Sequence, residues 1–89
     1  LDITPDFIKS FENAGYKNVD FDELPALKSL NITPEFIRSF EAVGFKNIDL
    51  DEIVAIKAVG VTPEYIKEMK SKGFNYEKIQ KYVTLKTLD

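Results

Sequence analysis

Two acidic turns are the residues of this chain whose types and spacing come closest to supporting chemistry. They read Asp20-Phe21-Asp22-Glu23 and Asp49-Leu50-Asp51-Glu52. Carboxylates grouped in this way could ligate calcium or work as an acid–base pair. A calcium loop, however, alternates its oxygen ligands over about twelve residues and bends at a glycine, and neither turn has that spacing. An acid followed three residues later by glutamate is typical of a capping box, so we interpret both turns as helix starts.

The composition removes most other kinds of active site. The 89 residues include 12 basic and 15 acidic side chains but no histidine and no cysteine. An imidazole base, a thiolate nucleophile, the usual zinc ligands and a disulfide framework are therefore all missing. Ser10 and Ser39 have basic neighbours but no group of suitable pKa to activate them. We expect no catalytic residue, no cofactor and no metal, so the chain is predicted not to be an enzyme. No apolar run approaches the roughly 20 residues of a membrane span, so we expect no membrane insertion by this segment.

The last third of the chain is rich in lysine. Residues 61–89 carry six lysines against four acids, whereas residues 3–31 and 32–60 each carry five acids against three bases. Lysines interleaved with Tyr65, Tyr76 and Tyr82 could contact nucleic acid. That segment has no arginine for bidentate recognition of guanine, however, and the whole chain has a net charge of −3. Nucleic acid is therefore the weakest of the partner hypotheses, and we interpret the lysines as a solvated surface.

An internal repeat of 29 residues defines the elements that must position these side chains. Thr-Pro pairs and glycines recur in one register, which divides the chain into residues 3–31 (unit 1), 32–60 (unit 2) and 61–89 (unit 3). Each unit predicts two short helices, with threonine as N-cap, proline in the first turn and glycine in the left-handed position that ends the first helix. The predicted structural caps are Thr4, Pro5, Gly15, Asp20, Thr33, Pro34, Gly44, Asp49, Thr62, Pro63 and Gly73.

The second helix of each unit is less regular. Pro25 lies five residues after Asp20, so we expect that helix to start loosely or to kink. In unit 3, lysines replace the acids at the helix start, and Asn75 offers an earlier cap. The last helix is therefore predicted to be longer, from about residue 76 to residue 88.

Short helix pairs cannot bury their apolar faces alone, but stacked pairs can. The sequence therefore predicts an all-α fold in which three helical hairpins stack as a short α-solenoid, within one domain of residues 1–89. A compact six-helix bundle is the alternative. Ile8, Ile37 and Ile66 are expected to share the interior.

The two ends of the array differ in character. The position of Ala14 and Val43 becomes Lys72 in unit 3, as expected for a C-terminal cap whose outer side meets water. Unit 1 shows no such change. We therefore expect either further repeats upstream or a homo-oligomer formed through the N-terminal face. Because the chain begins with Leu1 rather than methionine, we expect a processed product or an excised piece.

Repeat arrays commonly bind partners along one continuous face. The candidate partner-binding residues are Tyr16, Phe21, Phe45, Leu50, Phe74 and Tyr76. The alternative is that these side chains pack between units as core. We predict a module that binds a protein or peptide, with a structural spacer or self-association module as the alternative.

The repeated pattern T-P-[DE]-[FY]-I-[KR]-x-[FM]-x-x-x-G-[FY], followed in units 1 and 2 by DELPALK and DEIVAIK, resembles a known type of repeat. It is similar to the tandem TPEYI…GF…LDELIALK…GV repeats of bacterial exported proteins and of β-lactam-sensor-type membrane metallopeptidases, where they lie in the extracytoplasmic C-terminal regions. The resemblance covers residues 4–28, 33–57 and 62–74. It implies an extracytoplasmic accessory region of a larger bacterial protein. It brings no catalytic residue, because the peptidase zinc motif has no counterpart in a chain without histidine.

Overall fold

The regular structure of the chain is helical. The computed structural model describes residues 3–17 and 19–88, and no strand occurs in these two ranges. The elements are α1 (Pro5–Asn13), the 3-10 turn η1 (Phe21–Glu23), α2 (Leu24–Ser29), α3 (Pro34–Ser39), the 3-10 turn η2 (Phe40–Val43), α4 (Leu50–Val59), α5 (Pro63–Ser71) and α6 (Ile79–Thr87). The predicted all-α class is confirmed.

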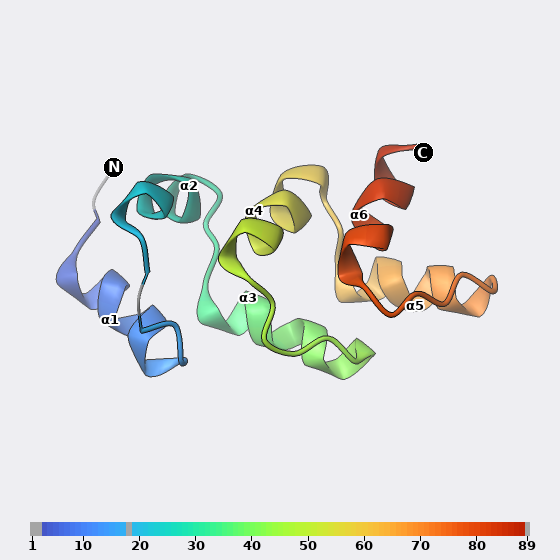
Figure 1. The fold of residues 1–89 in the computed structure, drawn as a ribbon, viewed down its shortest axis with the longest axis horizontal. Coiled ribbons are helices and arrows are strands. Elements are labelled where there is room, and N and C mark those ends of the chain that lie inside the picture. The colour runs from blue at the N-terminus through green and yellow to red at the C-terminus, as the bar shows by residue number, and fades with distance from the viewer. Residues whose placement is uncertain (1–2, 18, 89) are drawn as a thin grey trace.

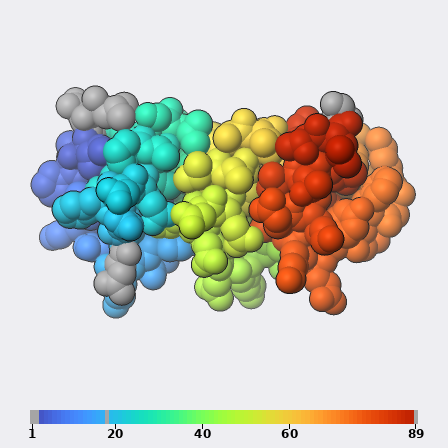
Figure 2. Space-filling model, turned by 45° about the horizontal axis from the view of Figure 1, so that its top comes forward, coloured from blue at the N-terminus to red at the C-terminus, as the bar shows by residue number. Residues whose placement is uncertain are grey.

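The helices lie in two rows along the long axis of the molecule (Figure 1). One row contains α1, α3 and α5, and the other contains α2, α4 and α6. The overall extents are 42 × 22 × 17 Å, with the N-terminal and C-terminal segments at opposite ends. In Figure 2 the colours run from blue to red without folding back, so units 1, 2 and 3 follow one another in space as they do in sequence.

The predicted caps of the first helix in each unit are confirmed. The hydroxyl oxygens of Thr4, Thr33 and Thr62 accept hydrogen bonds from the backbone N–H three residues later, at 3.2, 3.1 and 3.0 Å. Proline follows in the first turn, where its missing N–H costs no hydrogen bond. Glycine follows the last turn with φ between 94° and 104° in all three units, a conformation that side-chain-bearing residues avoid.

The predicted capping boxes of the second helices form only in part. Asp20 and Asp49 are N-cap residues as predicted, and the Glu23 carboxyl meets the backbone N–H of Asp20. The Asp20 carboxylate accepts from the Asp22 N–H at 3.2 Å, and it caps the 3-10 turn η1 rather than an α-helix. Asp49 has the extended backbone of an N-cap, but its side chain makes no capping hydrogen bond. The α-helical part of unit 1 begins only at Leu24, with Pro25 in its first turn. This agrees with the loose start expected from a proline that cannot donate an N–H.

The prediction of a longer last helix is wrong. The α6 helix begins at Ile79, and its N-cap residue Lys78 makes no side-chain capping bond. The reason is the Tyr82 hydroxyl, which donates to the carbonyl of Phe74 at 2.7 Å and accepts from the N–H of Tyr76 at 3.1 Å. These two bonds hold the backbone after Gly73 outside the helix, so Asn75 cannot act as its cap.

One apolar core runs through all three units. Ile66 is fully buried, Ile37 is 5% exposed and Ile8 is partly buried, so the three isoleucines share the interior as predicted. In each unit a lysine of the second helix also lies over an aromatic ring of the first helix, which joins the two helices of the pair. The distances from Nζ to ring centroid are 5.0 Å for Lys28 over Phe7, 4.6 Å for Lys57 over Phe36 and 5.3 Å for Lys86 over Tyr65.

Candidate functional site

The six predicted partner-binding side chains are divided between core and surface. Phe45 and Leu50 are buried, whereas Tyr16 and Tyr76 are partly buried. Phe21 is 73% exposed and Phe74 is 40% exposed. The six therefore do not form one exposed ladder. Phe45 and Leu50 belong to the apolar core, as the alternative interpretation predicts.

In units 1 and 2, the aromatic residue after the glycine that ends the first helix reaches into the following unit. Where unit 1 meets unit 2, which we call junction 1–2, the Tyr16 hydroxyl donates to the carbonyl of Ile48 at 3.0 Å. Where unit 2 meets unit 3 (junction 2–3), the Phe45 ring meets the Tyr82 ring edge-on, with centroids 5.9 Å apart. Lys70 strengthens this second junction, since its Nζ donates to the carbonyl of Val43 at 2.9 Å.

The nucleic-acid hypothesis loses one of its contact residues. Tyr82 is fully buried, and both of its hydroxyl hydrogen bonds are made within unit 3. Tyr76 is partly buried, with its ring 5.2 Å from that of Tyr82. The tyrosines of unit 3 therefore do not form the interleaved surface that the sequence suggested.

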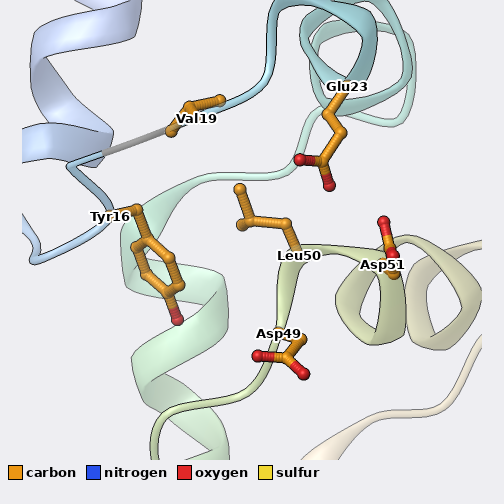
Figure 3. A pocket seen from close by; sticks show the side chains of 6 residues that line it. All are labelled: Tyr16, Val19, Glu23, Asp49, Leu50 and Asp51. Carbon is orange, nitrogen blue, oxygen red and sulfur yellow. The ribbon is translucent and has the colours of Figure 1, made fainter.

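An open hollow of about 310 Å³ lies at junction 1–2 (Figure 3). Its lining residues are Tyr16, Val19, Glu23, Asp49, Leu50 and Asp51. Figure 3 shows Leu50 in the middle of the hollow, between the Tyr16 ring and the Glu23 side chain. Unit 1 therefore contributes one wall of the hollow, and the start of α4 contributes the other.

A second hollow, of about 370 Å³, lies at junction 2–3. Its lining residues are Phe45, Lys46, Asn47, Ile48, Glu52, Glu77, Lys78 and Ile79. Five of these stand 29 residues after a residue that lines the first hollow. The two hollows thus occupy the same place in successive junctions, one repeat apart along the molecule.

The two hollows differ in charge. Every ionisable residue at the first is acidic apart from the Tyr16 phenol, whereas Lys46 and Lys78 accompany two glutamates at the second. The position of Asp49 in the first hollow is taken by Lys78 in the second. The hollow at junction 1–2 therefore favours a cationic group on a partner, whereas the hollow at junction 2–3 favours neither sign of charge.

Two side chains of the first hollow have shifted pKa values. Burial raises the pKa of the Glu23 carboxyl, and the facing Asp51 carboxylate raises it further (Figure 3). Burial likewise raises the pKa of the Tyr16 phenol, with smaller contributions from the negative charges of Asp49 and Glu41. Tyr16 therefore stays protonated at neutral pH and keeps donating to Ile48 across the junction.

Within residues 3–17 and 19–88, no group of three carboxylate side chains is placed to hold a metal ion. No helix in the described part of the chain has the length and apolar character needed to cross a membrane.

Comparison with protein-family models, with curated proteins and with solved structures gives no match. The resemblance to tandem repeats of bacterial exported proteins therefore stays a prediction.

Sequence reasoning missed three residues of the first hollow. The sequence predicts no binding role for Val19, and it predicts Glu23 and Asp51 only as helix-start residues. The 29-residue register contains the missing signal, because Val19 and Ile48 are equivalent apolar residues just before the two acidic turns. Val19 and Ile48 each line the hollow at the junction that follows their unit.

Proposed function

We propose that this chain is a non-enzymatic helical repeat module, a short α-solenoid of three hairpins, that binds a protein or peptide along its inter-unit hollows. The solenoid proposal is supported by the linear order of the units and by the lysine–aromatic pair that recurs in each unit. The non-enzymatic part rests on the composition, which lacks histidine and cysteine.

The observation that carries the binding proposal is the recurrence of one hollow at two successive junctions. Repeated hollows in fixed register suit an extended partner that places one side chain in each. The acidic lining at junction 1–2 favours lysine or arginine as the side chain bound there. The resemblance to bacterial repeats supports placing the module in a larger exported protein.

Peptide display tests this proposal. A random peptide library is selected on the chain, and the enriched peptides are measured by isothermal titration against the chain and two variants. Asp49→Lys with Asp51→Lys reverses the charge of the first hollow. Glu12→Lys with Glu64→Lys changes the net charge equally at exposed positions outside both hollows.

The proposal expects enriched peptides to carry a basic residue and to lose affinity at least about tenfold on the hollow variant. The control variant should bind them within about twofold of the unchanged chain, since only long-range charge is altered. Equal binding to both variants, or a selection without enriched peptides, would contradict binding at the hollows. Far-UV circular dichroism checks that both variants keep their helices.

A further inference from the structure

The N-terminal end of the molecule is less well covered than its interior. At one repeat position, Phe21 is 73% exposed in unit 1, whereas Leu50 is 8% exposed in unit 2 and Ile79 is 5% exposed in unit 3. The prolines agree in direction, since Pro5 is exposed, Pro34 is buried and Pro63 is partly buried. Units 2 and 3 each follow another of the three units, and that preceding unit supplies this cover. Unit 1 thus presents an uncovered half-junction.

The C-terminal end presents the other half-junction. Phe74 is 40% exposed, whereas its equivalent Phe45 is 9% exposed because Tyr82 of the next unit covers it. Leu88 is 78% exposed, whereas its equivalent Val59 is partly buried. An open hollow of about 250 Å³ lies here, lined by Tyr65, Met69, Lys72, Phe74, Leu85 and Leu88. Unit 3 is therefore only partly polar on its outer side. A capping unit is expected to be polar there, and the exposed Phe74 and Leu88 depart from that expectation.

We propose that a second copy of this chain docks head to tail, with the outer face of unit 3 of one copy against the outer face of unit 1 of the next. The outer face of unit 1 is defined by Pro5, Ile8, Phe21 and Asp22, and that of unit 3 by Lys72, Phe74, Lys81 and Leu88. The contact repeats the junction that the chain already forms twice internally. At this contact, Phe21 of one copy occupies the position that Leu50 and Ile79 hold at the two internal junctions. It lies beside Phe74 of the other copy.

Charge selects this arrangement over the alternatives. At junction 1–2 the Glu23 carboxyl faces the Asp51 carboxylate, which is an unfavourable pair. In the 29-residue register, the equivalent pair between copies is Lys81 of one copy and Asp22 of the next. The like-charged pair is therefore replaced by an ion pair. A dimer through two unit 1 faces would instead bring acidic residues together, since unit 1 has five acids against three bases.

The symmetry of the contact determines the kind of assembly. The contact joins two different faces. An assembly of any length therefore keeps one uncovered unit 1 face at one end and one uncovered unit 3 face at the other, so it grows as an open chain. Figure 2 shows the two ends of the molecule on opposite sides, which leaves both available at once. This proposal rests on the stacking of units and does not require peptide binding at the hollows, so either proposal can fail without the other.

Sedimentation velocity over a range of concentrations tests the proposal with face variants. The unchanged chain is expected to increase steadily in average mass as the concentration rises. Phe21→Glu blocks the unit 1 face and Leu88→Glu blocks the unit 3 face, and each variant alone should be monomeric, with association weakened at least about tenfold. Mixing the two variants restores one junction and should give dimers that grow no further.

Charge exchange tests the register independently. Lys81→Glu and Asp22→Lys should each weaken association, and the double variant should recover it because the ion pair is re-formed with reversed signs. Lys67→Glu is the matched control, because this position is exposed in all three units. Association of this control should match that of the unchanged chain.

Several results would overturn the proposal. A chain that stays monomeric at millimolar concentration has no such contact. If Leu88→Glu still dimerises and mixing adds nothing, two unit 1 faces meet instead. Association that survives both face variants uses another surface, and a double charge variant no better than the single ones contradicts the register.

Discussion

Leu50 and Phe21 occupy the same repeat position, one buried at a junction and one exposed at the free end. Comparing their truncation therefore measures how much a junction contributes to the free energy of unfolding. Leu50 is 8% exposed at junction 1–2, whereas its equivalent Phe21 is 73% exposed at the free end. Truncating a buried leucine to alanine typically costs 2–5 kcal/mol. Leu50 borders an open hollow, which solvent can fill, so we expect Leu50→Ala to lower the free energy of unfolding by about 2 kcal/mol.

Phe21→Ala should cost much less. With Phe21 73% exposed, only about a quarter of its burial energy is at stake, or about 0.5 kcal/mol. Urea unfolding followed by far-UV circular dichroism at low micromolar concentration, where association between copies is minimised, measures both values. For a chain of this size, the loss at Leu50 corresponds to a fall in Tm of about 8 °C or more. Equal losses at the two positions would refute the claim that unit 1 covers Leu50.

Three further predictions concern single groups. Tyr82→Phe removes both hydrogen bonds of the buried hydroxyl and should lower the free energy of unfolding by about 1–2 kcal/mol in urea unfolding. Gly44→Ala forces a side chain to φ 94° and should cost about 1 kcal/mol, measured by thermal unfolding. Glu23→Gln should stabilise the chain by about 0.5 kcal/mol at pH 7, because it removes repulsion with Asp51. The raised pKa means that Glu23 favours the folded state below its ordinary value of 4.5 and loses this contribution as pH rises, so the benefit of Gln should vanish near pH 4 in a pH series.

The first helix of each unit could be predicted almost completely from the sequence. Thr33 and Gly44 bracket α3 and η2, and both act through local backbone geometry that a short motif encodes. The all-α class and the shared interior of the isoleucines follow from the same local pattern. The caps depend on residues within about one helical turn, and the shared isoleucines follow from the 29-residue repeat, so a single sequence suffices for both.

Features that depend on contacts distant in sequence could not be predicted. The start of α6 is set by the Tyr82 hydroxyl, whose bonds to Phe74 and Tyr76 cross a turn that no capping rule describes. The burial of Phe45 depends on Tyr82, in the next unit, and that pairing requires the three-dimensional stack. Aspartate is a common N-cap residue, so the sequence predicts Asp49 as a cap. Its side chain makes no capping bond and lines the hollow between units instead, which only the structure shows.

Distances between spin labels test the central claim, the linear stacking of three equivalent units, most directly. The chain has no native cysteine, so cysteines can be introduced in pairs at the exposed and equivalent positions Lys9, Arg38 and Lys67. Pulsed electron paramagnetic resonance on the three pairs should give a 9–67 distance close to the sum of the 9–38 and 38–67 distances. Three similar distances would show that the helices close into a compact bundle and would contradict the account.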